Sequence, residues 1–145
     1  MAIVKELGTR RVFMGKLAHG ADLLEEITTI CVDNNIKLGR IEGLGAVKKS
    51  CLGFYSQDTK EYQYLTLDKN MEISNLVGNV SLKDGVPIVH AHITLSDEQG
   101  CAYGGHLAPD TIIFACEILV HELDGPEFRR GTDQVTGLPL WELQK

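Results

Sequence analysis

The sequence lacks the features of a membrane-spanning or secreted protein. No stretch of its 145 residues approaches the roughly 20 consecutive apolar residues that a transmembrane helix needs. The N-terminus has no basic region followed by a long apolar run, which is the pattern of a secretory signal peptide. We therefore expect a cytoplasmic protein without a membrane partner.

Cysteine is scarce and scattered. The four cysteines form no Cys-x-x-Cys pair, so the sequence shows neither a disulfide framework nor a thiolate zinc site. Free and mostly buried thiols in a reducing compartment are the simplest interpretation of Cys31, Cys51, Cys101 and Cys116.

Positive charge is also in short supply. The chain has 14 Lys and Arg residues against 20 Asp and Glu, which gives a net charge of −6. A surface that binds nucleic-acid phosphates normally needs a basic field, so direct DNA binding is not the expected function. The pairs Arg10-Arg11 and Lys48-Lys49 are more typical of a solvated surface than of a nucleic-acid groove.

The length and composition fit one globular domain, residues 1–145, with an ordinary hydrophobic core. One amphipathic helix is predicted at about 22–33. Asp22 can cap its N-terminus with Glu25 three residues later, and Asn34-Asn35 can close it in a left-handed turn. Apolar residues recur at helical spacing at Leu23, Leu24, Ile27, Ile30 and Cys31.

Most of the remaining chain alternates with a period of two and is interrupted by glycines, which predicts strands. They are expected at 10–17, 37–44, 48–55, 61–67, 71–80 and 111–120, with hairpins over 87–107 and 128–145. One main helix and many antiparallel strands predict the α+β class, with the helix covering one face of an antiparallel or mixed sheet.

The stretch from Pro87 to Leu107 concentrates three of the five histidines. His90 and His92 point to the same face of a strand, because side chains two residues apart share a face. A hairpin turn would bring His106 near them, and Gly104-Gly105 permits a close backbone approach or a positive φ. Three imidazoles suit Zn²⁺ and leave a fourth coordination position open. Hydrogen-bonded histidines in a half-buried sheet are the alternative that spacing leaves open.

Other polar residues have weaker signals. Glu117 lies inside the most apolar predicted strand, either on its polar side or as an acid/base group beside the metal. Arg40 lies on a neighbouring predicted strand and could hold a carboxylate. His19 is expected in a loop, Trp141 in core or subunit-interface packing, and His121-Glu122 in solvent at the end of a strand.

The order of several short motifs resembles the PPC domain, also called DUF296, the plant- and prokaryote-conserved domain. The resemblance covers residues 10–122 and rests on Gly20-Ala21-Asp22-Leu23-Leu24, Gly43-Leu44-Gly45-Ala46-Val47, Leu52-Gly53-Phe54-Tyr55, residues 72–79, His90-Ala91-His92-Ile93, Gly104-Gly105-His106-Leu107 and Glu117-Ile118. Each motif alone is weak, but their combination in this order is specific.

The resemblance implies an antiparallel sheet around one helix, similar to the acetolactate decarboxylase architecture, and assembly as a homotrimer. It also implies a metal site at His90, His92 and His106, which makes the metal the preferred interpretation. Plant members read DNA through an AT-hook, an Arg-Gly-Arg-Pro core that is absent here. The chain therefore resembles a stand-alone, prokaryotic-type PPC domain, to which the family's DNA-binding role transfers poorly.

Three functions remain in competition. The first is an oligomeric assembly and binding module that carries a metal, meets a protein partner or a small anionic ligand, and takes part in transcription control. The second is a zinc-dependent lyase that acts on a small oxo or hydroxy acid, with Glu117 moving a proton. The third is direct DNA binding, against which the acidic composition argues.

Overall fold

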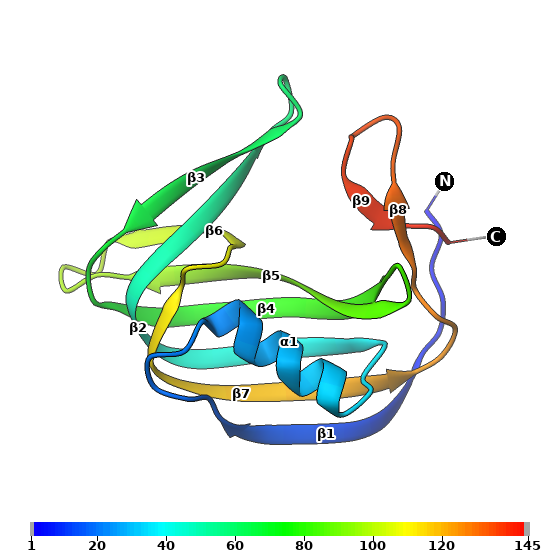
Figure 1. Cartoon of the computed structure of the whole chain (residues 1–145), viewed down its shortest axis with the longest axis horizontal. Coiled ribbons are helices and arrows are strands. Elements are labelled where there is room, and N and C mark those ends of the chain that lie inside the picture. The colour runs from blue at the N-terminus through cyan, green and yellow to red at the C-terminus, as the bar shows by residue number, and fades with distance from the viewer. Residues whose placement is uncertain (1, 144–145) are drawn as a thin grey trace.

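The computed structural model describes residues 2–143 and shows one helix and nine strands within them (Figure 1). In chain order these elements are β1 (Gly8–Lys16), α1 (Leu23–Asp33), β2 (Gly39–Ser56), β3 (Glu61–Leu67), β4 (Met71–Lys83), β5 (Val86–Ser96), β6 (Ala102–Leu107), β7 (Ile112–Asp124), β8 (Arg130–Thr132) and β9 (Pro139–Trp141). The structure therefore confirms the α+β class. Within the described residues, no helix is long and apolar enough to cross a membrane.

Seven strands form one antiparallel sheet in the order β1-β7-β2-β4-β5-β6, with β3 paired to β2. The long strand β2 connects the whole sheet. Its first half pairs with β4 and β7, and its second half pairs with β3 and, at Leu52 and Gly53, with β6. Because β2 reaches both β4 and β6, the sheet closes on itself, and β3 rises above the other strands with the second half of β2 (Figure 1).

The helix follows the sequence prediction closely. The Asp22 carboxylate accepts a hydrogen bond from the Glu25 backbone N–H at 3.0 Å, which caps the N-terminus of α1. Asn35 takes a left-handed conformation with φ 52°, so the predicted closing turn is confirmed. The helix buries Leu23, Ile27 and Cys31 in the core that the sheet forms (Figure 1).

The two strands predicted over 37–44 and 48–55 are one continuous strand, β2. The expected bend is a register shift in the pairing with β4, between Gly43 and Gly45. Gly45 has φ 147°, and a Cβ there would lie 2.1 Å from the Ala115 carbonyl oxygen. A bulge at a glycine thus changes the direction of the strand while the pairing on both sides continues.

Strand β7 continues past the predicted end at Val120, and this corrects the expectation of two solvated residues there. Glu122 is only 3% exposed. Arg11 on β1 donates a hydrogen bond from Nε to its carboxylate, and Arg10 lies 3.6 Å from the same group. The sequence prediction failed because the compensating charges come from a strand more than a hundred residues away.

The predicted C-terminal hairpin is present as β8 and β9, although residues 144–145 lie outside the described part of the chain. Its turn contains Gly137 with φ 76°. Trp141 packs edge-on against Phe128, with ring centroids 5.1 Å apart. The Tyr55 hydroxyl donates to the Thr136 carbonyl at 2.7 Å and links the hairpin to β2. This hydrogen bond holds the turn of the hairpin against the end of β2.

Candidate metal centre

The hairpin of β5 and β6 brings the three predicted histidines together. His92 lies directly opposite His106 in the strand pairing, and His90 is two residues along the same face of β5. The ring centroids are 5.1 Å apart for His90 and His106, 5.3 Å for His90 and His92, and 5.7 Å for His92 and His106. One ring nitrogen from each lies within 4.8 Å of the others. The predicted convergence is therefore confirmed.

The glycines before His106 serve a close approach of two backbones. A Cβ on Gly105 would lie 2.8 Å from the Gly53 carbonyl oxygen, and a Cβ on Gly53 would lie 3.3 Å from that of His106. Neither Gly104 nor Gly105 has a positive φ, so of the two expected uses only the close approach applies. These contacts fix the distance between β6 and β2, and this distance determines where the His106 ring lies.

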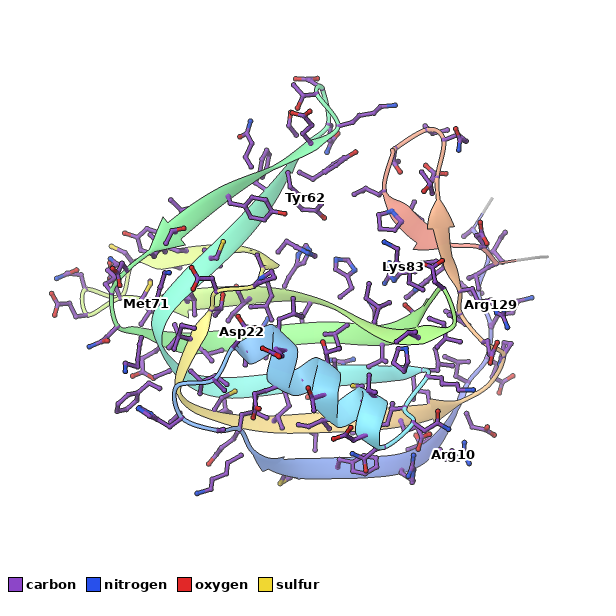
Figure 2. All side chains as sticks on the ribbon, in the orientation of Figure 1. Arg10, Asp22, Tyr62, Met71, Lys83 and Arg129 are labelled. Carbon is purple, nitrogen blue, oxygen red and sulfur yellow. The ribbon has the colours of Figure 1, made fainter. Side chains whose placement is uncertain are left out.

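The three rings line a pocket of about 590 Å³. Its walls come from α1, β2, β3, β5, β6 and the C-terminal hairpin, and they are mostly apolar or aromatic. Tyr62 projects from β3 (Figure 2), and its ring centroid lies 5.0 Å from that of His106. Of the residues that the structure describes, no Asp or Glu lines this pocket. The cluster therefore offers three nitrogen ligands in a pocket without acidic side chains, with His90 and His106 half-buried and His92 exposed.

Burial and positive neighbours favour the neutral form of His90 and His106. Burial is the largest cause that lowers the pKa of His90 to about 4, and Arg130 and the other two histidines add to it. Burial also lowers the pKa of His106 below its ordinary value, with His92 and Arg130 contributing. A neutral imidazole is the form that binds a metal, so His90 and His106 are ready to act as ligands at neutral pH.

The residues present fit a divalent transition metal. Three imidazoles match the catalytic type of zinc site, which has three protein ligands and an open fourth position. The Nδ1 atom of His106 is buried and has no hydrogen-bond partner among the described residues. An unpaired buried nitrogen is costly, and a bound cation would satisfy a ring nitrogen of this kind. The interpretation as hydrogen-bonded histidines fails for this atom.

Arg130 is a pocket residue that the sequence analysis missed. Its Nε donates to the Ser81 hydroxyl at 2.7 Å and its Nη2 to the Asn79 side-chain oxygen at 2.8 Å. Asn79 lies opposite His90 in the pairing of β4 with β5. Cross-strand partners share a face, so this contact places the guanidinium beside the histidines. No sequence pattern pointed to it, because Arg130 lies in a short hairpin far from the histidines in the chain.

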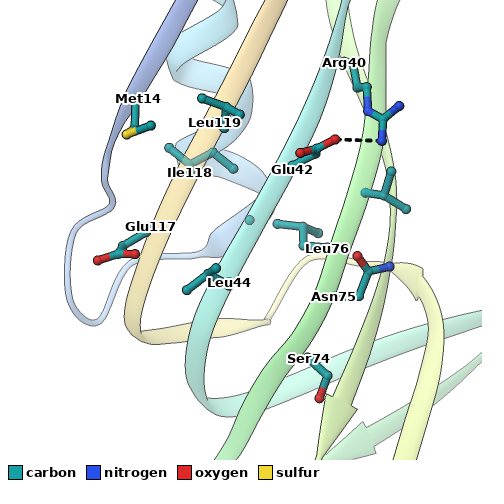
Figure 3. Close-up of a pocket in the computed structure, with 12 residues that line it drawn as sticks. Met14, Arg40, Glu42, Leu44, Ser74, Asn75, Leu76, Glu117, Ile118 and Leu119 are labelled. Carbon is teal, nitrogen blue, oxygen red and sulfur yellow. Dashed lines mark ion pairs between the residues drawn. The ribbon is translucent and has the colours of Figure 1, made fainter.

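Glu117 and Arg40 do not belong to this pocket. Both line a different hollow of about 380 Å³ on the face of the sheet away from α1 (Figure 3). Arg40 pairs there with Glu42 at 2.6 Å. Strands β2 and β4 separate β7 from β5, and the Glu117 side chain is exposed. Within one chain Glu117 is therefore not an acid/base group beside the histidines. His19 lies in a turn, as predicted.

Solved structures share this fold over nearly the whole chain. A metal-containing protein from Archaeoglobus fulgidus is 38% identical, with a TM-score of 0.92 over 97% of this chain and 99% of that one. A plant- and prokaryote-conserved (PPC) protein from Pyrococcus horikoshii is 35% identical, with a TM-score of 0.92 over 99% of each chain. A protein from Bacteroides thetaiotaomicron, described as a DNA-binding candidate, is 26% identical, with a TM-score of 0.85 over 94% and 96%.

A curated relative has a longer chain. The bifunctional protein GlmU of a Synechococcus species is 30% identical over 140 residues, which are 95% of this chain but 21% of that protein. This chain therefore spans about a fifth of the length of that relative. The family model of the Plants and Prokaryotes Conserved (PCC) domain matches residues 4–124, from before β1 to the end of β7. The chain belongs to the PCC domain family.

Proposed function

We propose that this protein is a metal-binding module in which His90, His92 and His106 hold one divalent transition metal ion, with zinc as the first candidate. The observation that carries the proposal is the meeting of one ring nitrogen from each histidine within 4.8 Å, in a pocket without acidic residues. The metal-containing relative from Archaeoglobus fulgidus supports it. The bound ion would offer a Lewis-acidic position that faces the pocket.

The chain's own residues define what surrounds that position. The β5–β6 pairing fixes the spacing of the rings, and Tyr62 covers one side of His106. Arg130 adds a positive charge to the same pocket. Mostly apolar walls limit water and strengthen electrostatic interactions with whatever enters. The module would thus bind a small anionic ligand as well as the metal.

Assembly as a homotrimer is the second part of the proposal. It is supported by apolar side chains on the sheet face away from α1, where Met14 is 83% and Leu44 57% exposed. Single exposed apolar residues are ordinary, but these line a common hollow (Figure 3). Multi-angle light scattering should give about three times the mass of 16.0 kDa, and Leu44→Asp should reduce it. A monomeric wild-type protein would contradict the homotrimer proposal.

A zinc-dependent lyase that acts on a small oxo or hydroxy acid is the alternative function. The observation that favours it is Arg130 in the same pocket as the histidines, because an enzyme of this type needs a group that holds the substrate carboxylate. The fold by itself does not establish a lyase activity, because one fold can have many functions. Turnover of 2-oxo or 2-hydroxy acids by the zinc-loaded protein, and its loss in His92→Ala, would establish the lyase.

A link to DNA-associated complexes is also a proposal, supported by the DNA-binding candidate among the related structures. The net charge of −6 favours an indirect link through a protein partner. Phosphate contacts release counterions, so direct binding would weaken steeply as salt rises. A mobility-shift titration at two salt concentrations tests this, and salt-sensitive binding by the purified chain would show direct contact.

The metal content of the untagged, purified protein tests the central proposal. Elemental mass spectrometry should find near one transition-metal ion per chain in the wild type and almost none in His92→Ala. His19→Ala is the matched control, because His19 is an exposed turn residue outside the pocket. Full metal content in a folded His92→Ala variant would contradict the assignment.

A further inference from the structure

We propose that the histidine pocket binds a small organic carboxylate with an apolar body, and that Arg130 holds its carboxylate group. This inference rests on the proposed function in one respect, because the metal ion would also bind an oxygen atom of the same ligand. The argument from Arg130 and the pocket walls stands on the structure of this chain alone.

The charge balance of the pocket calls for an anion. Arg130 is half-buried, and among the described residues no carboxylate lies within ion-pair distance of it. By contrast its neighbour Arg129 is exposed and pairs with Glu127 at 2.5 Å. A buried cation without a counter-charge is costly. The three imidazoles supply no negative charge, and a divalent ion held by them would increase the excess of positive charge.

Arg130 is held in place by neutral acceptors that leave part of its guanidinium free. Ser81 and Asn79 accept from Nε and Nη2, and the Pro139 carbonyl accepts from Nη1 at 2.8 Å. A guanidinium has five N–H donors, so one on each terminal nitrogen has no acceptor in these contacts. The side chain is therefore oriented before any ligand arrives, and it keeps two donors for the two oxygens of a carboxylate.

The walls of the pocket predict the rest of the ligand. Phe54, Tyr62, Ile88 and Leu140 line the same pocket as the histidines and Arg130. The volume of about 590 Å³ lies in the range of small-molecule sites, which bury most of the ligand surface. A strongly hydrated inorganic phosphate would leave these walls uncovered. A carboxylate on an aromatic or aliphatic body would cover them.

Calorimetry on the zinc-loaded protein of 145 residues tests this inference with phenylacetate as the probe. The comparison ligands are 2-phenylethanol, which lacks the charge, acetate, which lacks the body, and inorganic phosphate. Phenylacetate should bind at least about tenfold more tightly than each of them, as expected for a charge-assisted contact. In the cobalt-substituted protein it should also change the visible absorption spectrum, which reports an anion that reaches the metal.

Two variants test whether ligand binding depends on Arg130. Arg130→Gln should weaken phenylacetate binding at least about tenfold and leave the metal content unchanged. Arg129→Gln is the matched control and should bind like the wild type, because Arg129 lies outside the pocket. If Arg130→Gln fails to fold, the ligand comparisons with the wild type still decide the question, because they need no variant.

The outcomes distinguish this inference from the proposed function. Equal phenylacetate binding by wild type and folded Arg130→Gln, tighter binding of phosphate, or no binding by the zinc-loaded protein would overturn the carboxylate site and leave the metal site standing. If the wild type takes up no metal, the proposed function fails. The carboxylate site then stands only if the metal-free protein binds phenylacetate in a way that depends on Arg130.

Discussion

Two hollows along the sheet each contain an arginine but differ in how its charge is balanced. In the first hollow Arg40 is 60% exposed and pairs with Glu42 at 2.6 Å (Figure 3). In the histidine pocket Arg130 is half-buried and has only neutral acceptors. Exposed ion pairs stabilise little and suggest no ligand. A half-buried cation without a counter-charge beside three imidazoles does suggest a ligand, so charge balance distinguishes the two hollows.

The largest expected effect comes from removing two histidines of the pocket. His90→Ala/His92→Ala should abolish metal binding while leaving α1 and the core intact, because these side chains lie on the face opposite the buried residues of β5. A ligand that binds only the native state stabilises it by about 4 kcal/mol at 1,000 times its Kd. Excess zinc should therefore raise the Tm of the wild type, measured by scanning calorimetry, and not that of the double variant.

The close approach of β6 to β2 gives the next largest effect. Gly105→Ala should cost about 1–3 kcal/mol of unfolding free energy, because the added Cβ would meet the Gly53 carbonyl at 2.8 Å. It should also weaken metal binding by displacing His106. Gly15→Ala is the control, since no heavy atom lies within 4 Å of the added Cβ. Urea unfolding and a zinc titration measure both effects, and equal stability of the two variants would contradict this role.

Glu122 on β7 is a buried charge that has a partner of opposite charge, unlike Arg130. The hydrogen bond from Arg11 holds the pKa of Glu122 below its ordinary value of 4.5. Its stabilising contribution is therefore present above pH 4.5 and lost as the pH falls through the lower native-state pKa. Glu122→Gln should cost about 1–2 kcal/mol at pH 7, and much less at a pH below the native-state pKa of Glu122. Chemical denaturation at both pH values measures this, and a pH-independent difference would contradict it.

The smallest effects are expected in the hollow that contains Arg40 and Glu117. Arg40→Gln and Glu117→Gln should change the unfolding free energy by no more than about 0.5 kcal/mol, because both side chains are exposed. Neither should alter the metal content, in contrast to the histidine variants. Elemental analysis and thermal unfolding check this, and loss of metal in Glu117→Gln would show that this hollow contributes to the site after all.

The sequence predicted those features that depend on local patterns. The cap at Asp22, the turn at Asn35, and the shared face of His90 and His92 all follow from spacing within one element. The convergence with His106 required only a hairpin between neighbouring strands. The PPC resemblance, which the family match confirms, covered the same part of the chain.

Long-range contacts were the part that could not be predicted from the sequence. Arg130 lies beyond the matched residues 4–124 and reaches the histidines through its contacts with Asn79 and Ser81 on β4. Glu122 is buried because Arg11 reaches it from the opposite end of the chain. The sequence also contained no indication of where Glu117 lies. The order of the strands places it in the hollow that contains Arg40, away from the histidines. Each case depends on strand order, which periodicity does not specify.

X-ray absorption at the metal edge of the purified protein tests the central claim most directly, because it identifies the atoms bound to the metal. The three-histidine site predicts imidazole nitrogens at about 2.0–2.1 Å, with a light atom at the remaining position. The metal signal should disappear in His92→Ala. Sulfur at about 2.3 Å would instead place the metal at a cysteine and would contradict the account.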